Sequence, residues 1–130
     1  MYTNMTTNLM VESVDESVAF YKDILGFSVT ASVPADSGEL QFAILTKDGL
    51  NLMLQERTNL IGECPSLDTP KTQPSATLYI MVDNFDELCA DLKEKCGLLC
   101  DVHTTFYGAK EFAIVDNTGY VLTFTEHKDI

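Results

Sequence analysis

The chain contains one supersecondary unit twice, and this internal repeat limits the folds that it can adopt. Residues 11–26 align without a gap on residues 82–97, at an offset of 71. Residues 41–56 then align on residues 111–126 at an offset of 70, and they share a Phe-Ala-Ile tripeptide, a turn glycine, a leucine and a closing glutamate. Two copies are too few for a solenoid, so we expect them to pair and to form a site between or beneath them.

The composition is that of a globular protein. A length of 130 residues with 45% apolar side chains suffices for a compact core. No run of about 18 apolar residues occurs, and the N-terminus lacks a basic segment followed by an apolar one, so we expect neither a membrane span nor a signal peptide. The four cysteines show no CxxC spacing, and we expect Cys89 and Cys96 to be buried thiols in a reducing cytoplasm.

The charge balance is strongly acidic. The formal net charge is −12 and the isoelectric point is about 4.2. Such a surface repels phosphate backbones and anionic lipids, which disfavours nucleic acid and membranes as partners. It attracts cationic ligands at long range, although the same charge also serves solubility.

Periodicity predicts the same order of elements in both copies. The first copy has the pattern of a strand, a helix capped by Ser13 and ended by Gly26, a half-buried strand, and a hairpin that turns at Asp48-Gly49. The expected ranges are 6–11 for the first strand, 27–33 for the half-buried strand, and 40–46 and 50–56 for the hairpin. Residues 57–75 are polar and hold three of the four prolines, so we expect a linker there.

The second copy repeats this order. Asn84 caps the expected helix and Gly97 ends it, with a buried stripe of Phe85, Leu88, Cys89, Leu92 and Cys96. The expected strands are 77–82, 98–103, 110–116 and 120–126, with a turn at 117–119. We therefore predict an α+β fold, a single domain of residues 1–130 built from βαβββ repeats 5–56 and 76–127.

With these elements the chain resembles the vicinal oxygen chelate superfamily, which includes glyoxalases, extradiol dioxygenases, fosfomycin-resistance proteins and bleomycin-resistance proteins. The residues that carry the resemblance are the helix-to-strand phrase Phe20-Tyr21-Lys22-Asp23-Ile24-Leu25-Gly26-Phe27 and the phrase Asp116-Asn117-Thr118-Gly119-Tyr120 before the last strand. The resemblance implies two mixed sheets around a U-shaped cavity and a homodimer. It is specific for the fold and leaves the chemistry open.

In metal-dependent members of that superfamily, four strands each supply one ligand to the cavity. The corresponding positions in this chain are Thr6, Met53, Thr77 and Thr123. Hydroxyls and a thioether do not replace the imidazole, carboxylate or thiolate that Zn, Ni, Fe or Mn requires. We therefore expect neither a metal site nor another cofactor.

Other acidic and titratable residues offer weaker alternatives. Glu56 and Glu126 lie three residues beyond Met53 and Thr123, which places them on the opposite strand face unless a bulge shifts the register. His127 belongs to the chain end. His103 is either structural or a titratable group of the cavity wall.

The residues expected to face the ligand are mostly apolar or neutral. Phe106-Tyr107-Gly108 either anchors a loop in the core or presents Tyr107 to a ligand for stacking and hydrogen bonding. Strand parity with the four ligand positions adds a set of possible cavity residues: Asn8, Met10, Asn51, Gln55, Tyr79, Met81, Val121 and Thr125. No Asp or Glu is expected at these positions. The predicted ligand-binding set is Thr6, Asn8, Met53, Gln55, Thr77, Tyr79, Phe106, Tyr107 and Thr123.

Three functions follow from this pattern. The first is a glyoxalase or bleomycin-resistance-like protein that sequesters a small organic molecule, a drug or a metabolite, in a metal-free cavity. The second is a metal-free enzyme, for example an isomerase, with Tyr107 or His103 as the acid or base. The third is a metal-dependent lyase or dioxygenase, which requires Glu56, Glu126 or His103 to converge.

Overall fold

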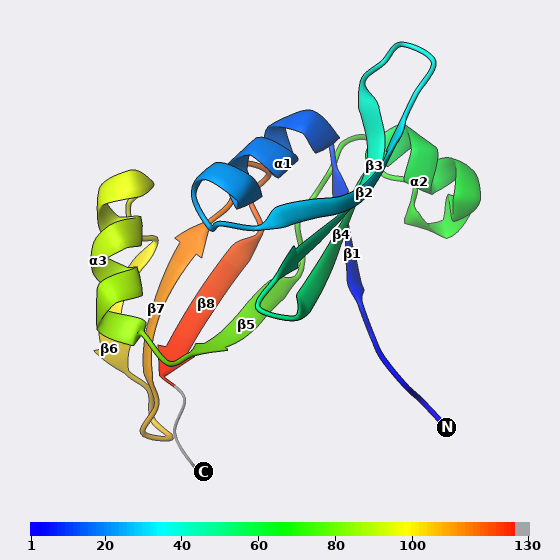
Figure 1. Cartoon of the computed structure of the whole chain (residues 1–130). Coiled ribbons are helices and arrows are strands. Elements are labelled where there is room, and N and C mark those ends of the chain that lie inside the picture. The colour runs from blue at the N-terminus through cyan, green and yellow to red at the C-terminus, as the bar shows by residue number, and fades with distance from the viewer. Residues whose placement is uncertain (127–130) are drawn as a thin grey trace. The chain divides into compact units, whose positions relative to one another are not determined.

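A computed structural model describes residues 1–126, and these form two compact units. The first unit runs from Met1 to Gln73, and the second begins at Pro74. Each unit has a strand, a helix and three further strands, as the repeat predicts (Figure 1). The α+β class and the two βαβββ units are thus confirmed, whereas the U-shaped cavity stays a prediction.

The first unit forms a four-stranded mixed sheet in the order β1-β4-β3-β2. β1 pairs in parallel with β4, and the other pairs are antiparallel. The elements are β1 (Thr7–Val11), α1 (Val14–Asp23), β2 (Ser28–Pro34), β3 (Leu40–Lys47), β4 (Leu50–Glu56), α2 (Arg57–Glu63) and the 3-10 turn η1 (Pro65–Leu67).

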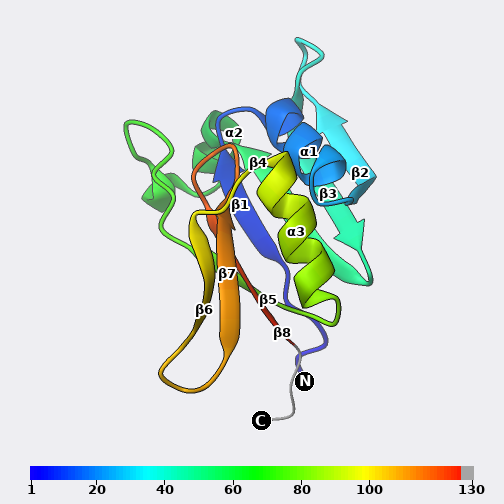
Figure 2. The same ribbon diagram turned by 90° about the vertical axis from the view of Figure 1, so that its left-hand side faces the viewer.

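The second unit has the same topology, in the order β5-β8-β7-β6. β5 is parallel to β8, and β6 and β7 form an antiparallel hairpin whose strands lie side by side in Figure 2. The elements are β5 (Thr77–Val82), α3 (Phe85–Lys95), β6 (Cys100–Thr104), β7 (Lys110–Val115) and β8 (Val121–Glu126).

Each helix buries one face of its own sheet. In the first unit, Tyr21 of α1 is fully buried, and its ring meets Phe27 edge-on at 5.7 Å. In the second unit, Phe112 stacks on Phe124 at 5.2 Å and meets Phe85 of α3 edge-on. Because strand side chains alternate between faces, each sheet has a second face, opposite α1 in the first unit and opposite α3 in the second. We call it the helix-free face, because neither α1 nor α3 packs on it; in the first unit α2 contacts β1 and β4.

The turns and the first helix cap follow their sequence signals. The Ser13 hydroxyl accepts a hydrogen bond from the Glu16 N–H at 3.1 Å, as an N-cap residue should. Asp48 and Gly49 both have positive φ, which a two-residue hairpin turn requires. In the second unit, Asp116 Oδ1 accepts from the N–H groups of residues 118, 119 and 120 and holds that turn.

Three local predictions are wrong. Asn84 stands at the N-cap position of α3, but its side chain makes no capping hydrogen bond. Cys89 is only half-buried and Cys96 is exposed, because α3 buries a narrow stripe that includes Phe85 and Leu92. β2 is exposed at every residue, since it is the edge strand and α1 packs mainly over β3 and β4.

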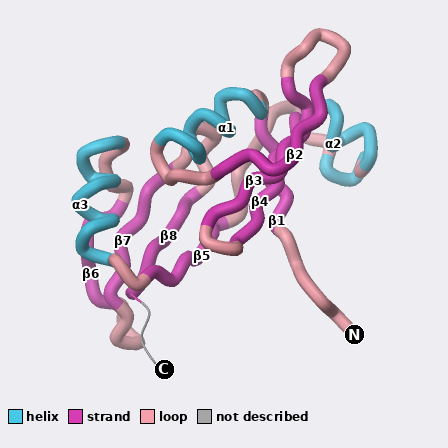
Figure 3. The backbone as a smooth tube through the Cα atoms, in the orientation of Figure 1, coloured by secondary structure: helices cyan, strands magenta, loops and turns pink. Residues whose placement is uncertain are grey.

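The segment predicted as a linker contains a helix. Residues Arg57–Glu63 form α2, and η1 follows it (Figure 3). Glu56 starts this helix, because its carboxylate accepts from the N–H groups of Thr58 and Asn59 at 2.7 and 3.1 Å. Sequence reasoning missed this N-cap, since a glutamate at a strand end is more typical of a solvated charge.

Candidate functional site

The helix-free face of the second sheet carries the residues that strand parity selected. Thr77, Tyr79 and Met81 of β5 lie opposite Val121, Thr123 and Thr125 of β8. Leu122 and Phe124, which alternate with the β8 residues, are buried on the helix side. The predicted parity is therefore confirmed for this sheet.

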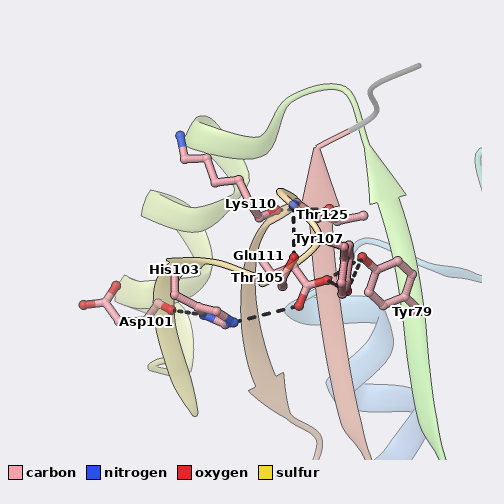
Figure 4. Close-up of polar contacts among 9 residues, drawn as sticks. Tyr79, Asp101, His103, Thr105, Tyr107, Lys110, Glu111 and Thr125 are labelled. Carbon is pink, nitrogen blue, oxygen red and sulfur yellow. Dashed lines mark hydrogen bonds and ion pairs between the residues drawn. The ribbon is translucent and has the colours of Figure 1, made fainter. Parts of the chain in front are cut away.

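Glu111, the second residue of β7, lies on this face, and its carboxylate is the focus of the polar contacts (Figure 4). The Tyr107 hydroxyl donates to Glu111 Oε2 at 2.7 Å, and the Tyr79 hydroxyl donates to the same oxygen. Glu111 is only 7% exposed, whereas Tyr79 and Tyr107 are 51% and 58% exposed. Two half-exposed phenols thus converge on one buried carboxylate.

The turn between β6 and β7 positions Tyr107. The Thr105 N–H donates to the Ala109 carbonyl at 2.8 Å, the Gly108 N–H donates to the Thr105 carbonyl, and the Ala109 N–H donates to the Thr105 hydroxyl. Gly108 has a φ of +86°, which suits glycine. The turn leaves the Phe106 ring fully exposed, 5.0 Å from the Tyr107 ring. Phe106 therefore does not anchor the loop in a core.

His103 completes the cluster from β6. Its Nδ1 lies 2.9 Å from the Asp101 carbonyl oxygen, and its Nε2 lies 3.9 Å from Glu111 Oε1. A backbone carbonyl accepts only, so Nδ1 carries a hydrogen. His103 thus lies beside Glu111, while His127 lies outside the described residues.

The cluster shifts the acidity of two of its members. Burial by itself raises the pKa of Glu111, but the hydrogen bonds from Tyr79 and Tyr107, together with His103, outweigh it and hold the pKa below its ordinary value. The Tyr79 contact and the Glu111 carboxylate raise the pKa of Tyr107, against a weaker opposing hydrogen bond from Thr105. Glu111 is therefore ionised at neutral pH and Tyr107 is a neutral phenol.

Sequence reasoning did not identify Glu111 as a residue of this face, and the strand register explains its position. Phe42 lies opposite Gln55 on the helix-free face, whereas Phe112 lies opposite Phe124 in the core. The shared Phe-Ala-Ile tripeptide therefore aligns residues of opposite faces. The structural counterpart of Glu111 is Phe42, at an offset of 69. A turn with an odd number of residues, 116–120, replaces the two-residue turn of the first unit and shifts the pairing by one position.

The first sheet holds a chain of amides in place of the carboxylate. Asn8 Nδ2 donates to Gln55 Oε1 at 2.9 Å, Gln55 Nε2 donates to Asn59 Oδ1 at 2.6 Å, and Asn59 Nδ2 donates to Gln41 Oε1 at 3.2 Å. Gln55 is 4% exposed, so the chain satisfies a buried amide. Asn8 and Gln55 were both predicted as ligand-binding residues, and Met53 lies opposite Asn8. Thr6 precedes β1.

The positions that hold metal in related proteins do not suit a divalent ion here. Thr6, Met53, Thr77 and Thr123 offer hydroxyls and a thioether, which are poor donors for Zn, Ni, Mn or Fe. Among residues 1–126, no group of three or more His, Cys, Asp or Glu side chains lies close enough to hold a metal.

The two closing glutamates have contacts of their own. Glu56 caps α2, and Glu126 Oε1 lies 4.0 Å from Lys110 Nζ.

A family model described as the Glyoxalase/Bleomycin resistance protein/Dioxygenase superfamily matches residues 4–124. The chain belongs to this superfamily. A comparison with curated protein sequences gives no significant match.

Several solved structures share the fold. TioX from Micromonospora sp. ML1 is 16% identical with a TM-score of 0.73, over 98% of this chain and 100% of that one. A glyoxalase-related enzyme from Fulvimarina pelagi is 17% identical with a TM-score of 0.76, over 98% and 89%. A lactoylglutathione lyase from Agrobacterium tumefaciens is 19% identical with a TM-score of 0.69, over 95% and 92%. Identities this low show the fold and not the activity. Within residues 1–126, no helix has the length and apolar character needed to cross a membrane.

Proposed function

We propose that this superfamily member binds a small organic molecule without a metal ion, on the helix-free face of its second sheet. One observation carries the proposal: half-exposed aromatic side chains surround a buried carboxylate whose geometry is already fixed by two phenols. Flat rings stack on exposed aromatic faces, and a few fixed polar groups then orient the ligand. From the predicted set, this site contains Thr77, Tyr79, Phe106, Tyr107 and Thr123, to which Glu111 is added.

The apolar part of the surface supports the same proposal. Phe106 is fully exposed and Met81 is 48% exposed. Large apolar side chains that stay exposed next to a polar group are typical of binding surfaces. Thr6, Asn8, Met53 and Gln55 form a corresponding candidate surface on the first unit, where neutral amides replace the carboxylate. The biological role of such binding is sequestration of a drug or metabolite by a cytoplasmic homodimer.

A ligand screen tests the proposal. Flat aromatic compounds are added to the 15N-labelled protein, and amide shifts are followed around Tyr79, Phe106 and Tyr107. Phe106→Ala weakens binding, while Leu67→Ala, which removes a 45% exposed leucine from the first unit, serves as the control. A screen in which no compound shifts these amides, or in which both variants behave alike, contradicts the proposed site.

Elemental analysis tests the metal-free part independently. The purified protein is analysed as isolated and after incubation with Zn, Ni, Mn and Fe(II). We expect no stoichiometric metal and no thermal shift. A tightly bound divalent ion at one per chain contradicts the assignment of Thr6, Met53, Thr77 and Thr123 as residues that hold none.

A metal-free enzyme is the second candidate, and His103 favours it. Nδ1 carries a hydrogen toward the Asp101 carbonyl, so Nε2, which faces Glu111, is the ring nitrogen that exchanges a proton with a substrate. Tyr107 is less suited as a base, because its pKa is raised. If a conversion is found, His103→Gln abolishes it and Tyr107→Phe only weakens it. A conversion that survives His103→Gln unchanged excludes this mechanism.

A further inference from the structure

In the site on the second sheet, the hydroxyl hydrogens of both tyrosines already form hydrogen bonds within the protein. Each phenol has a single hydroxyl hydrogen, and both Tyr79 and Tyr107 give theirs to Glu111 Oε2. Their oxygens lie 3.5 Å apart, but neither retains a hydrogen for the other. An ionised carboxylate only accepts, so Glu111 Oε1 adds a further acceptor. The three side chains can therefore only accept hydrogen bonds from a ligand.

His103 leaves the other carboxylate oxygen accessible to a donor. Its Nδ1 hydrogen points to the Asp101 carbonyl, and its Nε2 lies 3.9 Å from Glu111 Oε1, which is too far for a direct hydrogen bond. Glu111 Oε1 therefore keeps an acceptor position that His103 does not use. A bound group with N–H hydrogens fills that position.

The nearby cation and hydroxyl do not fill this need. Lys110 is adjacent to Glu111 in sequence, but its ammonium lies 3.3 Å from Asp86 and 5.1 Å from the centre of the Phe85 ring, on the helix side of the sheet. Figure 4 shows this side chain leaving the cluster. The Thr125 hydroxyl donates to the Lys110 carbonyl at 3.0 Å. The Glu111 carboxylate is therefore held by the two phenols, with His103 Nε2 3.9 Å away, and not by Lys110.

We propose that this site selects a flat organic cation rich in N–H donors, with an amidinium or guanidinium group placed against Glu111 Oε1 and its planar body on the exposed rings of Phe106 and Tyr107. The inference rests on the proposed binding function and names the ligand class of that same site. A planar cation donates charge-assisted N–H hydrogen bonds to a carboxylate oxygen, and it also stacks on an aromatic face. The net charge of −12 attracts it at long range.

Three matched compounds test the ligand class on the unmodified protein. Benzamidine, benzamide and benzoate share one ring and differ in charge and donors. Amide shifts around Tyr79 and Tyr107 give the three affinities at pH 7.5. We expect benzamidine to bind about tenfold or more tighter than benzamide, because a hydrogen bond to a charged group exceeds a neutral one by that much. Benzoate binds weakest.

A pair of charge variants then assigns the effect to one carboxylate. Glu111→Gln keeps the volume and still accepts from the phenols, and it removes most of the preference for benzamidine. Glu94→Gln removes one exposed charge from α3 of the same unit and leaves the preference intact. This control separates a local contact from the general acidity of the surface.

The outcomes separate the ligand class from the binding function. Benzamide that binds as tightly as benzamidine overturns the cation preference and leaves the proposed function standing. A preference that persists in Glu111→Gln overturns the role of Glu111. If none of the three compounds shifts these amides while other flat neutral compounds do, the ligand class is wrong. If no flat compound of any charge binds, both proposals fail.

Discussion

The two phenols that share one carboxylate oxygen predict a coupled, pH-dependent loss of stability. We consider Tyr79→Phe, Tyr107→Phe and the double variant. A hydrogen bond to a charged group contributes about 1.5–3 kcal/mol. Because both phenols are about half exposed, water replaces part of each contact; we expect about 1 kcal/mol for Tyr79→Phe and a measurable loss for Tyr107→Phe.

The double variant should lose more free energy of unfolding than the two single variants lose together. Each single variant leaves Glu111 with one phenol, whereas the double variant leaves a carboxylate that is 7% exposed without either. An unsatisfied buried acceptor costs about 1–3 kcal/mol. We therefore expect a loss of about 3 kcal/mol and a coupling energy of about 1 kcal/mol.

The pH dependence has a definite sign. In the native protein the pKa of Glu111 is below its ordinary value of 4.5, so its contribution to stability is present above 4.5 and is lost as the pH falls through the folded pKa. Without the phenols, burial dominates and raises that pKa above 4.5, which favours the protonated form. The stability gap between wild type and double variant is therefore larger at pH 7 than at pH 4.

Urea unfolding followed by far-ultraviolet circular dichroism measures these free energies at both pH values. Tyr2→Phe is the control, because Tyr2 is fully exposed, and it should leave the unfolding free energy unchanged. Strict additivity at pH 7, together with an equal gap at pH 4, would refute the shared-carboxylate geometry.

Other substitutions test the register, a helix cap and the amide chain through the free energy of unfolding. Phe112→Ala should cost about 3–5 kcal/mol and Phe42→Ala about half of that or less, since the first ring is fully buried and the second is not; equal costs contradict the one-residue shift. Ser13→Ala should cost about 1 kcal/mol, whereas Asn84→Ala should stay within about 0.5 kcal/mol because no side-chain cap exists there; the reverse order contradicts the cap assignment. Gln55→Ala should cost about 1–3 kcal/mol, because it leaves two amide partners unpaired, and a neutral result excludes a stabilising chain.

Local signals in the sequence were sufficient for the architecture. Ser13 and Glu16 mark the start of α1, Asp48-Gly49 marks a tight hairpin, and each produces the element that it predicts. These signals work because they depend on residues a few positions apart, whose geometry the backbone fixes. For the same reason, the alternation of side chains correctly predicted which residues of β5 and β8 share a face.

Sequence reasoning missed Glu111. The face on which its side chain lies depends on how the β7–β8 hairpin differs from the β3–β4 hairpin. Glu111 is adjacent to a phenylalanine that matches Phe42 in sequence, although the two phenylalanines lie on opposite faces of their sheets. The decisive quantity is whether the turn has an even or an odd number of residues, and a single residue reverses every side chain of the strand.

The sequence by itself determined the βαβββ repeat, the start of α1, the Asp48-Gly49 hairpin and the side-chain alternation of β5 and β8, because periodicity and capping are local properties of the chain. Only the tertiary structure brought Tyr79, His103, Tyr107 and Glu111 together, from four separate segments of the second unit. Distances across the sheet decide which strand ends meet. They also decide which hydroxyl groups donate to the buried carboxylate. Those distances follow from register and packing, which no single segment encodes.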